Sequence, residues 1–309
     1  MKVLITGGGG FVGSRLTKAC LNRGYEVVVV DKSKGELEGY MHPNMKFIET
    51  SVEDKNLIKI AAEGCNVAYY SAWSFAEKLM EGFTIDVIGF INFMEACCDA
   101  GVRHVLFPSS SVIYGEPIKY PITEDHPLLV ERSRAPVHAI TKLAVEKIME
   151  IYYRERGIPF TIFRFWWAFS DERIPGGTLR KIIDSAIKGE SLNVPRASSG
   201  SVLYAQDLIR AFEVATLNER AFGKTYNILS FNITWKEFLE TIVELAGSKS
   251  SVTEVDPLEW KGSGFLTGKW ILDDSKIKTD LGFVPDEASA KRAFIEALKK
   301  TIESRRTAL

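Results

Sequence analysis

Short apolar runs recur along the first half of the chain, and longer stretches with helical periodicity separate each run from the next. The runs that predict strands are residues 2–5, 26–30, 46–49, 66–72, 104–107 and 160–164. No hairpin turn joins neighbouring runs, and runs without polar alternation are typical of strands buried on both faces. The pattern therefore predicts an α/β fold in which a parallel sheet is covered by helices on both sides.

Local signals mark the ends of the helices between these strands. Asp54 is the expected N-cap or first-turn residue of one helix, because its carboxylate can accept from free backbone N–H groups. Gly101 is the expected end of a long helix over residues 82–100. Another helix is predicted over residues 136–156, with a proline in its first turn and Gly157 after its end.

The regular alternation breaks down after residue 165. Loops rich in glycine, proline and serine are interspersed with predicted helices near residues 179–188, 235–246 and 290–303. We expect a sheet domain over residues 1–170, to which the chain returns near residues 203–230, and a smaller lobe built mainly from residues 171–309. No internal repeat or low-complexity linker separates the two parts.

A glycine-rich turn follows the first strand and opens the first helix. Gly7, Gly10 and Gly13 stand three residues apart, which permits a tight turn and a close approach of the helix to the strand. The free N–H groups at the start of that helix can bind a pyrophosphate. The second strand ends on Asp31, whose carboxylate can accept from ribose hydroxyls. Strand, loop, helix and acid together predict a bound dinucleotide.

The charge of Asp31 also indicates which dinucleotide is bound. A carboxylate at this position repels a 2′-phosphate and so favours NAD. NADP remains the alternative, because Arg15, Lys32 and Lys34 are nearby in the sequence.

The composition excludes several other classes of protein. The chain has 309 residues, of which 46% are hydrophobic and 26% charged, and its net charge is −1. It has no long basic run, so nucleic-acid binding is not expected. No apolar stretch is long enough for a signal peptide or a membrane span, so a cytoplasmic protein is expected. The four cysteines and four histidines lack metal-ligand spacing, so we expect reduced core cysteines and no metal.

Several longer motifs resemble one family. They are Thr6-Gly7-x-x-Gly10-Phe11-x-Gly13, residues 107–115 (FPSSSVIYG), residues 142–146 (KLAVE), residues 226–228 (YNI), residues 273–277 (DDSKI) and residues 281–283 (LGF). Together they are similar to the extended short-chain dehydrogenase/reductase family, the NAD-dependent epimerase/dehydratase group. The resemblance implies a Rossmann-type, doubly wound parallel sheet with a smaller C-terminal substrate lobe. It also implies a homodimer that pairs through the helices at residues 82–100 and 136–156.

The resemblance implies a catalytic serine, tyrosine and lysine. Ser110 matches the serine, which would hydrogen-bond the reacting substrate oxygen, and Lys142 matches the lysine, which would hold the nicotinamide ribose. The tyrosine position, four residues before Lys142, is occupied by His138. Two interpretations stay open: His138 is the acid/base group, since imidazole titrates near neutral pH, or catalysis is lost and His138 only fills the position.

Other expected contacts follow from the same resemblance. The predicted cofactor contacts are Gly7, Gly10, Phe11, Val12, Gly13, Asp31, Lys32, Ser51, Val52, Ala72 and Lys142. The predicted substrate contacts are Ser111, Trp73, Trp166, Trp167 and Arg196. The family's dehydratases and decarboxylases carry acids where this chain has Ser111 and Val112, so elimination chemistry lacks its acid and base. The family's usual diphosphate-binding arginine is also missing near residue 200, and Arg196 is the nearest replacement.

These features predict an NAD-dependent epimerase or oxidoreductase that transfers hydride between a substrate carbinol or ketone and the nicotinamide. The family favours a nucleotide sugar as the small-molecule substrate. Two alternatives remain: a reductase or dehydrogenase of a smaller or more apolar alcohol or ketone, which the tryptophans favour, and a dinucleotide-binding regulatory or assembly protein with little catalysis.

Overall fold

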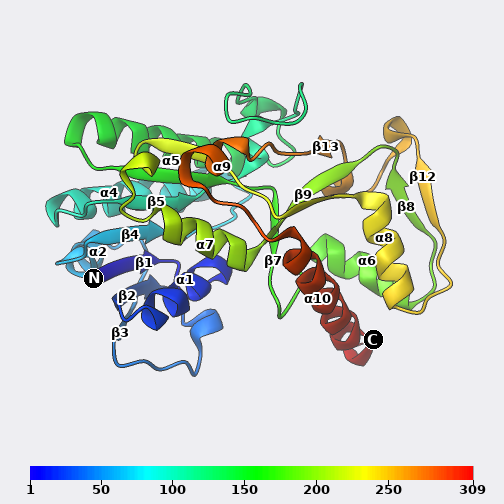
Figure 1. Cartoon of the computed structure of the whole chain (residues 1–309), viewed down its shortest axis with the longest axis horizontal. Helices are drawn as coiled ribbons and strands as arrows, with labels where there is room; N and C mark the ends of the chain where they lie inside the picture. The colour runs from blue at the N-terminus through cyan, green and yellow to red at the C-terminus, as the bar shows by residue number, and fades with distance from the viewer. Residues whose placement is uncertain (309) are drawn as a thin grey trace.

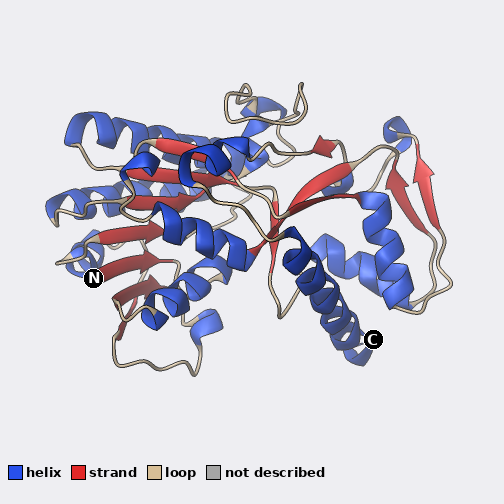
Figure 2. Cartoon of the chain, viewed as in Figure 1, coloured by secondary structure: helices blue, strands red, loops and turns tan. Residues whose placement is uncertain are grey.

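A seven-stranded sheet forms the larger part of the computed structural model, which describes residues 1–308 (Figures 1 and 2). Every neighbouring pair of its strands is parallel, and the order is β10-β6-β5-β4-β1-β2-β3. The strands are β1 (Lys2–Thr6), β2 (Glu26–Asp31), β3 (Met45–Glu49), β4 (Val67–Tyr70), β5 (Val105–Pro108), β6 (Phe160–Arg164) and β10 (Lys224–Asn227). This order confirms the Rossmann-type, doubly wound sheet.

Helices cover both faces of this sheet (Figure 1). The helices are α1 (Phe11–Asn22) and α7 (Ala205–Ala215) on one face, and α2 (Lys55–Ala62), α4 (Gly89–Asp99) and α5 (Pro136–Arg156) on the other. Along β1, Val3 and Ile5 pack into the core beneath α1 and α7, whereas Leu4 packs into the core beneath the other three helices. The central strands β1, β2, β4 and β5 read as largely apolar runs because both of their faces are buried, whereas the edge strands β3 and β10 carry polar residues.

The helix predicted over residues 82–100 is not regular. It consists of α3 (Leu79–Gly82), a π-helical stretch η2 (Phe83–Ile88) and then α4. Asp86, in the π-helical stretch, is 2% exposed and accepts hydrogen bonds from the backbone N (2.7 Å) and the hydroxyl (3.0 Å) of Ser74. The wider turn of a π-helix changes which side chains face inward, and an apolar pattern does not reveal that change.

Helix α2, which follows β3, begins with a side-chain cap that the local sequence predicts. The carboxylate of Asp54 accepts from the backbone N–H groups of Asn56 (3.1 Å) and Leu57 (3.0 Å) at the start of α2. The predicted N-cap role is therefore confirmed.

A smaller lobe lies beyond the carboxyl ends of the large sheet (Figure 1). Its elements are β7 (Trp167–Phe169), α6 (Gly177–Ile187), β8 (Leu192–Pro195), β9 (Ser199–Tyr204), β11 (Phe231–Thr234), α8 (Trp235–Leu245), β12 (Val252–Val255), β13 (Lys269–Trp270) and α10 (Glu287–Ala308). Strand β9 is its centre and pairs with β11, β13 and β7. Strand β7 begins three residues after β6 ends, and the chain returns to the large sheet through α7, β10 and α9 (Ser275–Leu281).

One buried ion pair joins helix α5 to strand β6. The Glu146 carboxylate lies 2.6 Å from the Arg164 guanidinium, and the two side chains are 1% and 6% exposed. Glu146 also accepts from the Ser109 hydroxyl at 2.5 Å, and Arg164 donates to the Tyr114 hydroxyl at 3.0 Å. Tyr114 in turn donates to Asn227 on β10 at 2.7 Å. The network ties the end of the sheet to the helix that carries the predicted catalytic residues.

Helices α4 and α5 lie beside each other on the face of the sheet that also carries α2 (Figure 1). Exposed apolar side chains on η2 and α5 include Ile88, Ile151 and Tyr153. Pairing of two copies through these helices stays a prediction. Among residues 1–308, no helix has the length and apolar character that crossing a membrane requires.

Candidate active site

A cavity of about 950 Å³ opens at the carboxyl ends of the large sheet, between the sheet and the smaller lobe. Gly7, Asp31, Ala72, Ser110 and Phe165 line it, and each lies at or shortly after the end of a different strand. The carboxyl edge is where ligands bind in open parallel sheets. Further lining comes from α5, from the segments after β3 and β4, from α3 and η2, and from the smaller lobe.

The glycine loop forms one end of the cavity. Gly7 has a φ of 67°, and a Cβ built there would lie 2.3 Å from the backbone N of Ala72. A Cβ on Gly13 would lie 2.1 Å from the carbonyl oxygen of Gly7. Gly10 is the N-cap of α1, where no side chain caps the helix and the first turn carries no acid. The helix start is therefore left for an anionic ligand, which fits the pyrophosphate of NAD.

Asp31 completes the cofactor end. Its carboxylate accepts from the backbone N of Gly9 at 2.9 Å, which holds it beside the glycine loop. Arg15 is engaged by Glu36 at 2.7 Å and by Glu172 at 2.5 Å, so it is not free to bind a 2′-phosphate. The arrangement fits NAD better than NADP.

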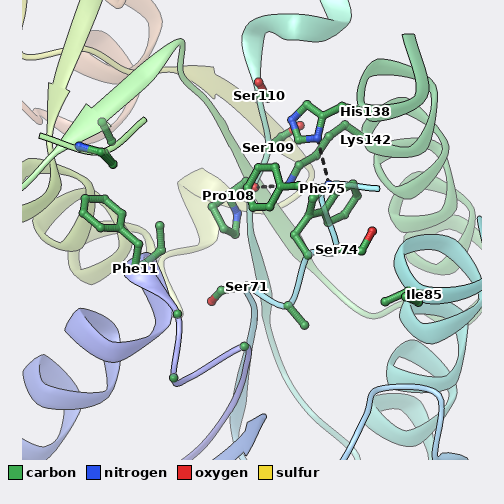
Figure 3. A pocket seen from close by; sticks show the side chains of 18 of the residues that line it. Phe11, Ser71, Ser74, Phe75, Ile85, Pro108, Ser109, Ser110, His138 and Lys142 are labelled. Carbon is green, nitrogen blue, oxygen red and sulfur yellow. Dashed lines mark hydrogen bonds between the residues drawn. The ribbon is translucent and has the colours of Figure 1, made fainter. Parts of the chain in front are cut away.

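Lys142 lies at the other end of the cavity, on α5. Its ammonium donates to the carbonyl oxygen of Pro108 at 2.9 Å (Figure 3). The ammonium also lies 3.6 Å from the centre of the Trp73 ring and 4.4 Å from that of Phe107. Burial lowers the pKa of Lys142 to about 7, although the Asp86 and Glu146 carboxylates oppose the shift. An ammonium between two aromatic rings is held by its interaction with their electron-rich faces.

His138 lies one helical turn before Lys142. Its Nδ1 accepts a hydrogen bond from the indole Nε1 of Trp73 at 3.0 Å, and the Phe75 ring stacks on the imidazole at 5.3 Å (Figure 3). Burial lowers the pKa of His138 to about 3, and the nearby charges of Lys142 and Arg134 lower it further. His138 is therefore neutral at pH 7. The Ser110 hydroxyl, which accepts from the backbone N of Val112 at 3.2 Å, also lines the cavity.

Most of the predicted contacts meet in this one cavity. The cavity is lined by the predicted residues Gly7, Gly10, Phe11, Val12, Asp31, Lys32, Ser51, Val52, Ala72, Trp73, Ser110, His138, Lys142, Trp166 and Trp167. Gly13 lies behind the glycine loop, against Gly7. Ser111 is buried, and Arg196 is exposed at the end of β8; neither belongs to the lining. The roles of the lining residues stay predictions.

Trp166 and Trp167 both pack in the interior of the protein and line the cavity. Trp166 is 7% exposed and stacks on Trp270 with 3.9 Å between ring centres. Trp167 packs against Phe238 and Phe294 of the smaller lobe. Each also contributes to the lining, so the substrate half of the cavity has aromatic walls.

Arg134 is a lining residue that the sequence analysis missed. Its guanidinium lies 3.7 Å over the centre of the Trp166 ring and donates to the carbonyl oxygen of Gly264 at 3.1 Å. Within residues 1–308, no carboxylate lies within ion-pair distance of it. No local pattern marks this arginine, because its partners follow much later in the chain.

The model of the NAD dependent epimerase/dehydratase family matches residues 3–228. A UDP-glucose 4-epimerase of Lactobacillus helveticus is 32% identical, with 97% of this chain and 96% of that protein covered. A low-salt glycan biosynthesis protein of Haloferax volcanii is 30% identical, with 93% of this chain and 94% of that protein covered.

Solved structures share the fold over the whole chain. A UDP-N-acetylglucosamine 4-epimerase from Methanobrevibacter ruminantium superposes with a TM-score of 0.81 at 22% identity, covering 100% of this chain and 99% of that one. A UDP-glucuronic acid 4-epimerase from Bacillus cereus, solved in complex with NAD, has a TM-score of 0.81 at 20% identity and the same coverage.

Proposed function

Because the chain belongs to the NAD-dependent epimerase/dehydratase family, we propose that it is an NAD-dependent enzyme that epimerises a nucleotide sugar by hydride transfer. The observation that carries the proposal is a single cavity that runs from the glycine loop and Asp31 to Ser110, His138 and Lys142. A dinucleotide laid along this path brings its nicotinamide to the end where the hydroxyl, imidazole and ammonium groups converge.

The chemistry needs three functions from the protein. NAD, which the glycine loop and Asp31 would hold, would supply the acceptor for the hydride of the carbinol carbon and the donor that returns it to the opposite face of the ketone carbon. As the C–H electron pair leaves the carbinol, the O–H proton is released, and the reverse step takes a proton up again. Ser110 contacts the reacting oxygen, Lys142 holds the nicotinamide ribose, and His138 lies beside that oxygen.

The lining favours this chemistry over elimination. The carboxylates that line the cavity are Asp31, at the cofactor end, and Glu81, on α3. The positions at which the family's dehydratases carry their acids are Ser111 and Val112, which are 0% and 4% exposed and face the core. Outside the cofactor end, the described lining therefore has no pair of carboxylates to act as acid and base, and simple hydride transfer needs no such pair.

Arg134 supports a nucleotide sugar as the substrate. It is an unpaired guanidinium in the substrate half of the cavity, and a diphosphate is the group that such a cation binds most strongly. The family's usual arginine has no room here: a Cβ on Gly200 would lie 2.6 Å from the Trp235 ring. The curated relative from Lactobacillus helveticus is a UDP-glucose epimerase, so UDP sugars are the first substrates to test.

The direct test is turnover by the purified protein with NAD and a panel of UDP hexoses and UDP N-acetylhexosamines. Epimer formation is followed by chromatography of the released sugars, and absorbance at the NADH band reports any net oxidation. The aromatic lining makes small aryl ketones with NADH the second panel. Conversion of the ketones alone would show that the substrate is a ketone and not a nucleotide sugar. Inactivity with both panels would contradict the proposed enzymatic function.

Cofactor selection is expected to depend on Asp31. NAD at about a hundred times its dissociation constant should stabilise the native protein by about 2.7 kcal/mol, and NADP at the same concentration should stabilise it less. Asp31→Ala should weaken NAD binding about tenfold or more, because the ribose hydroxyls lose a charged acceptor. Thermal shift against ligand concentration measures both.

Glu49→Gln is the matched control for Asp31→Ala. Glu49 ends the neighbouring strand β3, is in register with Asp31 and is exposed outside the cavity. Its replacement should leave NAD binding unchanged. Equal stabilisation of wild type and Asp31→Ala by NAD would contradict the assigned ribose contact.

Substrate binding is expected to depend on Arg134. Arg134→Gln should raise the KM for a UDP sugar about ten- to a hundredfold, since a hydrogen bond to a charged group contributes about 1.5–3 kcal/mol. Turnover at saturating substrate and NAD affinity should change little. The control is Arg196→Gln, because Arg196 is exposed and outside the lining. A larger effect at Arg196 than at Arg134 would reverse the assignment.

A further inference from the structure

The hydrogen bond between Trp73 and His138 fixes where the imidazole proton lies. An indole N–H only donates, so the Nδ1 atom of His138, 3.0 Å from Nε1 of Trp73, must be the acceptor and carries no proton. A neutral imidazole has one N–H group. That proton therefore lies on Nε2, and the lone pair of the ring is already occupied by Trp73.

The charged groups around the imidazole oppose its protonation. Lys142 lies one turn further along α5, and Arg134 approaches from the loop before the helix, so two cations face the ring. Asp86, the buried carboxylate of the neighbouring element η2, is engaged by Ser74. Glu81 lines the same cavity from α3. An imidazolium here would also lose the Trp73 hydrogen bond, because both partners would then be donors.

The segment that carries Trp73 is itself held firmly. Asp86 accepts from the backbone N of Ser74 at 2.7 Å and from its hydroxyl at 3.0 Å. The next residue, Phe75, has a φ of 53°, a left-handed conformation that is strained for a non-glycine residue. The two Ser74 bonds, together with the stacking of Phe75 on His138, keep this conformation. The indole is thus presented to the imidazole in a defined position.

We propose that Trp73 is a positioning residue that holds His138 as the Nε2–H tautomer, so that His138 donates a hydrogen bond to the substrate oxygen and does not accept its proton. In terms of the proposed function, on which this role rests, His138 polarises the ketone. The O–H proton released when the carbinol is oxidised passes to water in the cavity, and the Ser110 hydroxyl is the neighbouring group that can both accept and donate.

The tautomer can be observed without turnover. In protein labelled with 15N-histidine, the ring nitrogens of His138 are assigned by their loss in His138→Gln. We expect an unprotonated Nδ1 and a protonated Nε2 throughout pH 5–8. Trp73→Phe keeps an aromatic ring over Lys142 but removes the donor, so the His138 signals should shift toward the other tautomer. A protonated Nδ1 in the wild type, or identical signals in Trp73→Phe, overturns the proposal.

Turnover distinguishes a donor from a base. Glutamine at position 138 offers an N–H donor near the place of Nε2–H but has no basicity, whereas leucine offers neither. His138→Gln should lower turnover about tenfold, and His138→Leu should lower it about 10²–10³-fold, the usual cost of one donor to a developing oxyanion. Equal losses in both variants overturn the proposal, because a missing base would affect them alike.

The pH dependence of kcat/KM is the third test. The wild-type kcat/KM should show no ionisation between pH 5 and 8 that disappears in His138→Gln. If the wild type turns over no nucleotide sugar, the proposed function fails while the tautomer is still decided by the 15N signals. NAD-dependent thermal stabilisation of each variant shows that the fold is intact.

Discussion

Glu146→Ala is expected to lower the free energy of unfolding by about 3–5 kcal/mol, because it leaves the Arg164 charge buried without a partner. The Ser109 hydroxyl loses its acceptor in the same step. Since domains are stable by only about 5–15 kcal/mol, the loss is a large fraction of the total. Urea unfolding followed by tryptophan fluorescence measures it. Glu146→Gln, which keeps the shape and one acceptor, should lose less and serves if the alanine variant does not fold.

Glu150→Ala is the control for Glu146→Ala. Glu150 lies one turn further along α5 and pairs with Lys147 at 2.7 Å on the surface, where both side chains are about half exposed. Exposed pairs contribute about 0.2–1 kcal/mol, so this variant should unfold almost as the wild type does. Removing both buried charges in Glu146→Leu/Arg164→Met should recover part of the loss. Equal costs at positions 146 and 150 would show that the buried pair does not stabilise the fold.

Lys142→Met is expected to separate activity from stability. It removes a group placed in the active site, so turnover should fall about 10²–10⁴-fold. It also removes an ammonium that is only 6% exposed, and replacing a buried charge by an apolar side chain is commonly neutral or stabilising by about 1–4 kcal/mol. The variant should therefore be at least as stable as the wild type at pH 7 while being nearly inactive.

The pH dependence of stability tests the same residue. The pKa of Lys142 is lowered to about 7 from 10.5, so between these values the unfolded chain binds a proton that the native protein lacks. The contribution of Lys142 to wild-type stability therefore rises with pH across that range, whereas below pH 7 the cost of the buried ammonium is fully present. The difference between wild type and Lys142→Met should shrink from pH 6.5 to 9.5.

Lys147→Met, an exposed position on the same helix, should change neither activity nor the pH dependence. Subtracting each variant from the wild type at every pH removes the common contribution of the cysteines and tyrosines. A wild type whose stability relative to Lys142→Met is constant from pH 6.5 to 9.5 would contradict the buried-ammonium account.

The large sheet could be predicted because its signals are local. Most of its strands are apolar runs, although the edge strands β3 and β10 carry polar residues, and glycine, proline and Asp54 mark the ends of the helices. The strands of the smaller lobe could not be predicted in the same way. Strand β13 has two residues and β7 has three, and both exist only because β9 lies beside them. Such pairings are long-range, so no window of sequence contains them.

In the active site, too, the residues marked by local sequence could be predicted and those placed by long-range contacts could not. The glycine loop and Asp31 form a compact motif whose geometry follows from its spacing. His138 could be predicted as a site residue because it stands four residues before Lys142 in the sequence. What His138 touches could not be found, because Trp73 and Phe75 come from another strand end. Arg134 was missed for a similar reason: its place over Trp166 depends on how the smaller lobe folds back.

The short connection between β6 and β7 has a consequence for engineering. Strand β7 starts three residues after β6 and pairs with β9. The large sheet therefore continues into the smaller lobe through a short connection and not through a long linker. The chain then crosses back and forth through α7, β10 and α9. The smaller lobe is therefore not one continuous segment of the chain. A chimera that exchanges it would need chain junctions at several places. New substrate preferences are more directly obtained by changing individual wall residues such as Trp167 and Phe265 within the intact frame.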